Sequence, residues 1–350
     1  MSKTCPARSK SSAAKEVQTA GGSISKLVSG FPNLYLVECD GTDIVDVYRA
    51  AGSAISHARE QRAPAFIHAH CTRPHSHSMS DDERAYRTKK ERAAQDLRDP
   101  ITRTSVLLLE SQAATAEELK DLELEIEAEV ASAADKALAS PQPGPETAML
   151  HLFSEDCDPT SSDFDTEDDP QYGDDSLLTM VDLLNACISS EMERDPRITV
   201  FGQDIADVSR EEALSEVKGK GGVFKVTHGL QKRFGSERVY NTPLAEANII
   251  GRGIGQAMRG LRPVVEIQFF DYIWPAMNQL RNELATIRYR SNGTYSAPLV
   301  VRTTYGGYLK GGAIYHSQTG ETLFTHTPGL YVCMPATAED ANGLLRTAIR

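Results

Sequence analysis

The sequence lacks several features that would define a compartment or a class of partner. Its six cysteines are scattered, and none stands in the CxxC spacing that is typical of zinc sites. No apolar run is long enough to cross a membrane, and the polar start has no hydrophobic core of a secretory signal. We therefore expect reduced cysteines, no membrane partner and a cytoplasmic setting, or the mitochondrial matrix if the source is eukaryotic.

Positive charge is also scarce. The chain has 37 Lys and Arg residues against 49 Asp and Glu residues, which gives a formal net charge of −12. Such a chain repels phosphate, and this excludes nucleic acid as an expected partner. The excess is local, because residues 155–175 carry ten acidic side chains and no Lys or Arg. With the preceding PQPGP, this run predicts a linker with little fixed structure, which is either a solvated spacer or a docking tail.

The first third of the chain shows strand and helix patterns in alternation. A strand over 34–39, a helix over 43–61 and a strand over 64–71 predict a parallel βαβ unit, whose following polar loop lies where open α/β sheets bind ligands. We expect the helix to bury one face, which consists of Val47, Ala51, Ile55 and Ala58. Further helices are expected over 81–96, 100–110 and 115–138, the last with a Thr115–Glu118 capping box.

The βα alternation returns in the second half of the chain. Strands are expected over 198–201, 263–270, 298–304 and 331–335. Helices are expected over 177–194, after Thr242, over 271–290 and from Ala338. Strands that are apolar throughout indicate a parallel sheet covered by helices on both faces, and the predicted fold class is therefore α/β.

The stretch NTPLAEANIIGRGIGQAMRG (241–260) places a single carboxylate, Glu246, at the start of a helix with a small-residue face. Apolar neighbours would raise the pKa of this carboxyl and let it share a proton with the ring nitrogen of a bound ligand. The alternative is a glutamate that only interacts favourably with the helix dipole. The stretch by itself leaves both interpretations open.

Three stretches together carry a resemblance to a known family. They are residues 241–260, VVEIQFFDYIWPAMNQLRNELATIRYRSNG (264–293) and GGYLKGGAIYHSQTGETLFTHTPGL (306–330). In this order they resemble the β subunit of the decarboxylating component of 2-oxo acid dehydrogenase complexes, a thiamine-diphosphate enzyme. The loop RPHSHSMSDDERAYR (73–87) resembles a loop of the α subunit of the same family. The order of the two parts is similar to that of fused α–β decarboxylases.

The resemblance implies a domain organisation. We expect a thiamine-diphosphate-binding fold with parallel sheets flanked by helices, made of a partial α-type domain and a transketolase-like pyrimidine-binding domain. The expected parts are a disordered start (1–15), the carboxyl-terminal part of the α-type diphosphate-side domain (16–139), an acidic linker (140–176) and the β-type pyrimidine-binding domain (177–350).

The resemblance also implies a set of site residues. Glu246 would bond the pyrimidine ring nitrogen and so promote loss of the thiazolium proton, which makes the cofactor a nucleophile. His77 and His316 would supply protons and hydrogen bonds to the oxyanion and to the lipoyl group. Without the resemblance, His77 reads as part of a metal-binding or polar loop and His316 as a core histidine. The other implied residues are Leu244, Gln268 and Tyr272 around the pyrimidine ring, and Arg73, Asp81, Tyr86 and Arg87, which hold the loop in shape by hydrogen bonds. Ser78 matches a position that is phosphorylated in some relatives.

One expected part of the family pattern is missing. A GDG motif and a later Asn pair hold magnesium and the diphosphate in the α half, but this chain offers only Cys39-Asp40-Gly41, with no Asn over 60–75. Residues 16–25 resemble the stretch that comes directly after that Asn pair in the family. We therefore predict no metal ligand in this chain, expect the magnesium ligands in a missing amino-terminal segment, and expect truncation at both ends with poor cofactor binding.

The expected activity is also implied by the resemblance. EIQF (266–269) and DYIWP (271–275) are more similar to the branched-chain type, which implies oxidative decarboxylation of a 3-methyl-2-oxobutanoate-like acid. The acyl group would pass to lipoamide of a partner acyltransferase, in a homodimer or larger assembly. The alternatives are pyruvate as substrate, a catalytically silent module that binds partners, and a transketolase-like relative, which would lack the YHSQ and HSHS stretches.

Overall fold

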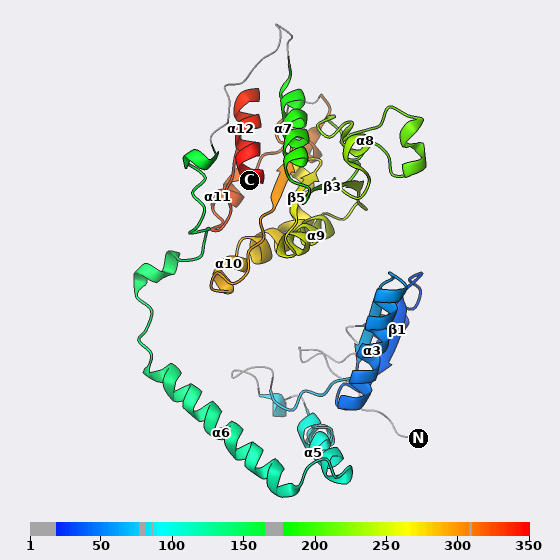
Figure 1. Cartoon of the computed structure of the whole chain (residues 1–350), viewed down its shortest axis with the longest axis vertical. Helices are drawn as coiled ribbons and strands as arrows, with labels where there is room; N and C mark the ends of the chain where they lie inside the picture. The colour runs from blue at the N-terminus through cyan, green and yellow to red at the C-terminus, as the bar shows by residue number, and fades with distance from the viewer. Residues whose placement is uncertain (1–18, 77–81, 86, 165–177, 308–309) are drawn as a thin grey trace. The chain divides into compact units, whose positions relative to one another are not determined.

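A computed structural model describes residues 19–76, 82–85, 87–164, 178–307 and 310–350. The chain divides into two compact units, Met1–Pro141 and Gln142–Arg350 (Figure 1). Each unit has its own parallel sheet. No helix of the described residues has the length and apolar character that spanning a membrane requires.

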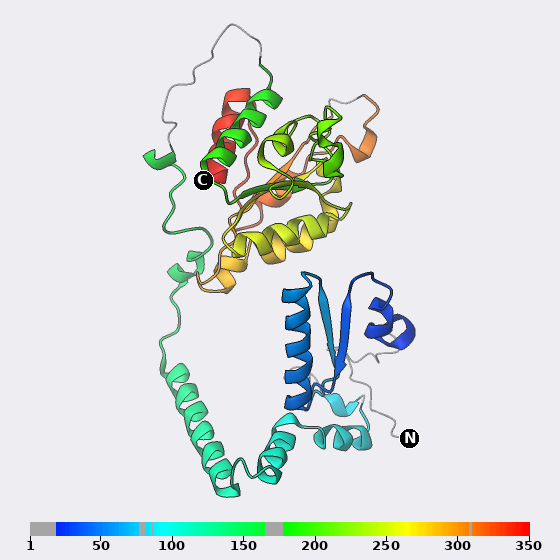
Figure 2. The same cartoon turned by 45° about the vertical axis from the view of Figure 1, so that its right-hand side comes forward.

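The first unit contains a parallel strand–helix–strand motif. Its elements are β1 (Tyr35–Cys39), α3 (Ile44–Glu60) and β2 (Ala65–Ala69). The two strands pair in parallel over their whole length, and α3 lies along one face of the pair (Figure 2). The side chain of Asp43 starts α3 by accepting hydrogen bonds from the first-turn N–H groups of Val45 and Asp46. The predicted βαβ unit is confirmed.

The buried face of α3 differs in part from the prediction. Val47 and Ala51 are half-buried as expected, but Ile55 is 49% exposed and Ala58 is exposed as well. The buried residues of the helix are instead Ala50 and Ala54. Two strands offer a narrow surface, and these small side chains let the helix axis approach it closely, whereas the flank that carries Ile55 lies beyond the sheet.

Four more helices of the first unit have clear start signals. They are α2 (Ile24–Val28), α4 (Lys89–Asp96), α5 (Pro100–Glu110) and α6 (Ala116–Ala139). The capping box of Thr115 and Glu118 is present as predicted. The helix expected over 81–96 begins only at Lys89, because a second capping box, Thr88 with Glu91, starts it there, after a single 3-10 turn at Glu83–Ala85.

The second unit is built on a four-stranded parallel sheet with the order β4-β3-β5-β6. The strands are β3 (Ile198–Gly202), β4 (Val239–Asn241), β5 (Arg262–Ile267) and β6 (Val300–Thr303). Three of them were predicted, and β4 was missed because it has only three residues. The strand expected over 331–335 is wrong, since this stretch pairs with no other strand in the described structure. Its side chains lie outward instead of in a sheet, and Tyr331 is 67% exposed.

Helices cover both faces of this sheet, as predicted for apolar strands (Figure 2). On one face lie α7 (Met180–Arg194) and α12 (Ala338–Ile349), and on the other α9 (Glu246–Met258). Side chains along a strand alternate between the two cores, so that Val200 joins the α7 side and Phe201 the α9 side. Every residue of β3 is buried. Shorter helices of the unit are α8 (Leu230–Phe234) and α11 (Glu321–Thr325).

A buried carboxylate joins α7 to α12. Glu191 is fully buried, and its oxygens accept from Arg346 Nη1 at 2.8 Å, Arg350 Nη2 at 3.1 Å and Arg194 Nη2 at 2.7 Å. Burial by itself raises the pKa of Glu191, but the hydrogen bonds from Arg350 and Arg194 outweigh it and hold the pKa below its usual value. The two helices are therefore tied by charge as well as by apolar contacts.

The single helix expected over 271–290 is wrong. The structure has short turns at Phe270–Tyr272 and Trp274–Ala276, a π-helix (η8) at Asn278–Leu284 and the short α10 at Ile287–Arg290. Pro275 gives the reason, because it has no N–H and its ring clashes with the carbonyl four residues earlier in a regular helix. The π-helix still buries Leu280 in the core on the α9 side.

Part of the acidic stretch is packed on the second unit. Arg288 Nε donates to the carbonyl of Phe153 at 3.0 Å, and its Nη2 forms an ion pair with Glu155 at 3.2 Å. The ring of Phe153 lies 4.6 Å from that of Tyr331. The expectation of little fixed structure is therefore wrong for residues 150–155, which contacts of Phe153 and Glu155 hold in place. Residues 165–177 lie outside the described part of the chain.

Candidate active site

The carboxyl ends of β3 and β5 hold the first part of the candidate site. The strand that follows β3 in the chain, β4, lies on one side of it, and the next strand, β5, lies on the other side. The strand order therefore changes direction at β3, and open α/β sheets bind ligands at such a switch point. Gln268 follows β5, is 8% exposed, and donates from Nε2 to the carbonyl of Gln203 at 3.0 Å. Thr304 Oγ1 donates to the carbonyl of Gln268 at 2.7 Å. Gln268 is therefore fixed between the ends of three strands.

His316 and Tyr272 form a hydrogen-bonded pair against Phe269, the residue after Gln268. Tyr272 Oη lies 2.7 Å from His316 Nε2, and His316 Nδ1 lies 3.2 Å from the carbonyl oxygen of Gly312. A carbonyl oxygen only accepts, so Nδ1 carries a hydrogen and Nε2 of the neutral ring accepts from the tyrosine hydroxyl. The edge of Phe269 packs against the imidazole with the ring centroids 4.5 Å apart at 90°. This arrangement fixes the orientation of the imidazole.

Glu246 and Leu244 lie at the end of β4. Glu246 is the first residue of α9 and is half-buried, and no side chain caps the helix before it. Leu244 is 70% exposed. β4 and β5 are separated by β3, so they are about 10 Å apart across the sheet. The structure thus brings Tyr272 and His316 together against Phe269, the residue after Gln268, and places Glu246 with Leu244 at the other side of β3, along the same edge.

These residues fit the pyrimidine end of a thiamine cofactor. An exposed apolar side chain next to a carboxylate suits a flat ring with a basic nitrogen, because such a ring would pack on Leu244 while its nitrogen would bond Glu246. Gln203 belongs to the same edge and was missed by sequence reasoning. Its position directly after β3 is the signal that could have found it.

In the first unit, Arg87 organises the segment that follows β2. Its side chain is 2% exposed, and Nη1 donates to the carbonyl of Arg73 at 3.2 Å, to Glu83 Oε2 at 2.9 Å and to Gln95 Oε1 at 2.7 Å. Glu83 was not predicted, although its spacing of four residues from Arg87 indicates such a pair. The predicted residues His77, Ser78, Asp81 and Tyr86 lie outside the described part of the chain.

The residues near Asp40 do not fit a magnesium and diphosphate site. Arg98 Nη2 and Arg103 Nη1 each donate to the Asp40 carboxylate at 2.8 Å, and Thr42 donates to it from both its N–H and its hydroxyl. Burial opposes ionisation of Asp40, but these hydrogen bonds outweigh it and hold its pKa well below the usual range. Both oxygens already face guanidinium groups, which leaves no place for a divalent cation.

Comparisons with known proteins agree with this division of the chain. Residues 11–146 match the family of the dehydrogenase E1 component, and residues 177–350 match the family of the transketolase pyrimidine-binding domain. Both families are thiamine-diphosphate-dependent α/β proteins. The chain carries both of these domain families, and the resemblance that the sequence indicated is confirmed.

Three curated relatives each match about half of the chain. The 2-oxoisovalerate dehydrogenase subunit beta of Bacillus subtilis (strain 168) is 50% identical over 175 residues, which are 50% of this chain and 50% of the relative. The protein of the same name from Pseudomonas aeruginosa is 44% identical over 49% of this chain and 45% of its own. The pyruvate dehydrogenase E1 component subunit beta of Leifsonia xyli subsp. xyli is 41% identical over 49% and 47%. The chain thus spans about half the length of these relatives.

Proposed function

We propose that this chain takes part in the oxidative decarboxylation of a branched-chain 2-oxo acid, with transfer of the acyl group to lipoamide of a partner acyltransferase. The observation that carries the proposal is the His316–Tyr272 pair against Phe269, at the carboxyl edge of a sheet with Glu246 on the same edge. The two relatives named 2-oxoisovalerate dehydrogenase support the branched-chain substrate. Pyruvate is the alternative substrate, because a third relative is named for it.

Each of the chain's own site residues would have a separate task. Bound thiamine diphosphate supplies a nucleophilic carbon and accepts the electron pair left by carbon dioxide. Glu246 would hold a proton at the pyrimidine nitrogen, and Leu244, Gln268 and Tyr272 would orient the ring. His316 Nε2, which shares the tyrosine hydrogen, would exchange a proton with the substrate oxygen that gains charge. His77, in the loop after β2, would supply protons and hydrogen bonds to the lipoyl group that accepts the acyl group. Magnesium ligands are proposed to lie outside the described residues.

A decarboxylation assay tests the proposal. Release of carbon dioxide from 3-methyl-2-oxobutanoate and from pyruvate would be measured with excess thiamine diphosphate, magnesium and an artificial electron acceptor. We expect Glu246→Gln to lower turnover at least about 100-fold, as for loss of a general acid–base group. Glu237→Gln, at an exposed glutamate of the same unit, is the matched control and should leave turnover unchanged. Full activity of the Glu246→Gln variant would contradict the catalytic assignment.

The second candidate is a catalytically silent module that keeps the fold and binds partners. The observation in its favour is the pairing of Asp40 with two arginines, which occupy the position that a magnesium ion bound to this carboxylate would need. No turnover of either acid by the wild-type chain, together with retained binding of thiamine at the Glu246 edge, would favour this candidate over the enzyme.

A further inference from the structure

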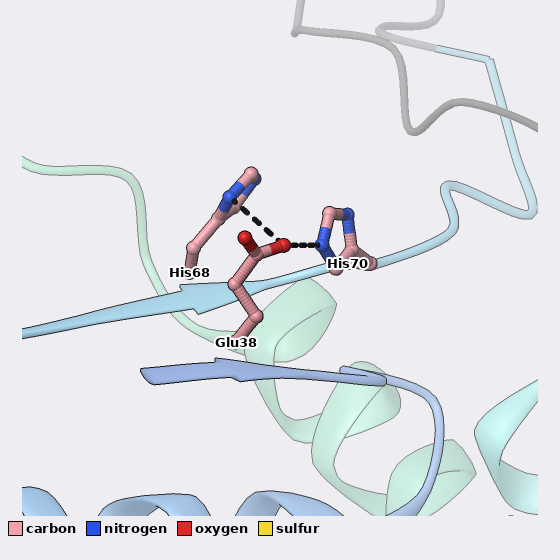
Figure 3. Close-up of side chains that lie close together, drawn as sticks. All are labelled: Glu38, His68 and His70. Atoms are coloured by element: carbon pink, nitrogen blue, oxygen red, sulfur yellow. Dashed lines mark hydrogen bonds and ion pairs between the residues drawn. The ribbon is translucent and has the colours of Figure 1, made fainter. Parts of the chain in front are cut away.

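A second group of chemically reactive side chains lies in the first unit, on the face of the two-stranded sheet opposite α3. Glu38 in β1 and His68 in β2 are register partners. His70 comes two residues after His68 and therefore lies on the same face. Figure 3 shows the three side chains pointing toward one another from adjacent strands. The backbone pairing alone thus brings together two imidazoles and a carboxylate.

The distances suit a single metal ion. One ligand atom from each of the three residues lies within 4.8 Å of the others. His70 Nε2 is 2.7 Å and His68 Nδ1 is 3.8 Å from the same Glu38 oxygen, Oε2. Ligand atoms about 2.0–2.2 Å from a tetrahedral zinc ion are about 3.3 Å from each other. The His70–Glu38 separation would therefore widen and the His68–Glu38 separation would narrow by about half an ångström each, and the ligand nitrogens of the two imidazoles, which lie within 4.8 Å, would move to about the same 3.3 Å.

The solvent exposure of these three side chains favours a metal-binding site over a buried hydrogen-bonded group that only stabilises the fold. The Glu38 side chain is 49% exposed and that of His70 35%, so the group is open to solvent and keeps room for a water ligand. The His68 side chain is 16% exposed, and its Nδ1 lies 2.6 Å from the hydroxyl of the buried Ser25, a hydrogen bond that Nδ1 would exchange for the bond to the ion.

We propose that Glu38, His68 and His70 form a binding site for a late first-row divalent cation such as Zn²⁺, with a water molecule in the fourth position. Two imidazoles and one carboxylate suit zinc, copper or nickel and are a poor set for magnesium, which prefers oxygen ligands alone. The site is therefore separate from any magnesium that accompanies the diphosphate. A bound ion joins β1 to β2 and stabilises the folded first unit by mass action.

Zinc titration of the full chain tests the site. The exposed thiols of Cys71, Cys157 and Cys333 would first be alkylated, since they bind zinc as well. Competition with a chromogenic chelator should then show one equivalent of bound Zn²⁺. We expect Glu38→Gln and His70→Asn each to weaken binding more than about 100-fold, beyond the effect of losing an outer-sphere partner. His326→Asn, at an exposed histidine of the second unit, is the matched control and should bind as the wild type does.

The result that would overturn the proposal is equally definite. No saturable binding by the wild-type chain, or equal affinity of the wild type and both variants, would mean that the three residues form only a hydrogen-bonded surface group. Circular dichroism shows whether each variant is folded, and Co²⁺ substitution gives an independent readout. The d–d absorption of tetrahedral cobalt should appear with the wild type and be absent with Glu38→Gln.

Discussion

The two parallel sheets of this chain differ in how much of each strand is enclosed. All residues of β3 are buried between helices on both faces of the four-stranded sheet, whereas in β1 only Cys39 is buried. The second unit has two hydrophobic clusters, one on each face. In the first unit, α5 and α6 contain no buried residue. The comparison teaches that side chains at the edge of the second sheet are held by a packed core, whereas those on the first sheet depend on local polar contacts.

Core truncation should give the largest difference between the two units. Ile250→Ala removes a fully buried side chain from α9 and should cost about 2–5 kcal/mol of the free energy of unfolding of the second unit. Ile126→Ala makes the same change in α6, where the side chain is 50% exposed, and should cost at most about 0.5 kcal/mol. Urea unfolding of both variants measures the contrast. Equal costs would mean that α6 is as well packed as α9.

Removal of the buried carboxylate should have the next largest effect. Glu191→Ala leaves Arg346 and Arg350 next to one another without their shared partner. Loss of one member of a buried ion pair typically lowers the free energy of unfolding by about 3–5 kcal/mol. Because both arginines are partly exposed, we expect a loss at the lower end of this range, about 3 kcal/mol. Thermal unfolding of the second unit would show it. An unchanged unfolding temperature would mean that apolar contacts alone hold α7 to α12.

Acid should destabilise the second unit through Asp195. Hydrogen bonds from the Arg197 side chain lower the pKa of Asp195 to about 2. Because this pKa is lower in the folded than in the unfolded state, the stabilisation is complete above about pH 5 and is lost as the pH falls toward 2. At most about 2 kcal/mol is at stake, because Arg197 is largely exposed and screened. Urea unfolding of Asp195→Asn between pH 7 and pH 2 should show a weaker pH dependence than the wild type, and equal slopes would rule out this cause.

The smallest change in stability is expected at the site itself. Tyr272→Phe removes the hydroxyl that His316 Nε2 accepts from and should cost only about 1 kcal/mol. Its effect on turnover of 3-methyl-2-oxobutanoate should be larger than its effect on stability, because the imidazole loses its fixed partner. Tyr289→Phe, at a half-exposed tyrosine of the same unit, is the control. Equal turnover in the two variants would remove Tyr272 from the proposed machinery.

Local signals predicted the parts of the fold that local chemistry decides. The Thr115–Glu118 capping box fixed the start of α6, and the apolar runs gave three of the four strands of the second sheet. The short β4 carried too few residues for a pattern, and Pro275 broke a helix that the apolar spacing favoured. Whether a short or interrupted element forms depends on the residues that pack against it, and the periodicity of its own sequence carries no information about them.

The candidate site was predicted unevenly for the same reason. The YHSQ and EIQF stretches gave His316 and Gln268 through resemblance, but the hydroxyl that bonds His316 and the carbonyl that bonds Gln268 are evident only in the folded chain. Glu38 and His70 stand 32 residues apart, and only the register of β1 with β2 joins them. Likewise, no local pattern indicates that Asp40 is paired with Arg98 and Arg103, which lie about 60 residues further along the chain.

The most direct test of the proposed pyrimidine site is calorimetric titration of the chain with thiamine diphosphate, with and without magnesium, and with thiamine as the diphosphate-free comparison. We predict weak binding that depends on Glu246, is reduced in Glu246→Gln, and changes little when magnesium or the diphosphate is left out. Tightening by magnesium of tenfold or more, about 1.4 kcal/mol, would contradict this prediction. That result would show that residues of this chain hold the metal and diphosphate despite the arginine pair at Asp40.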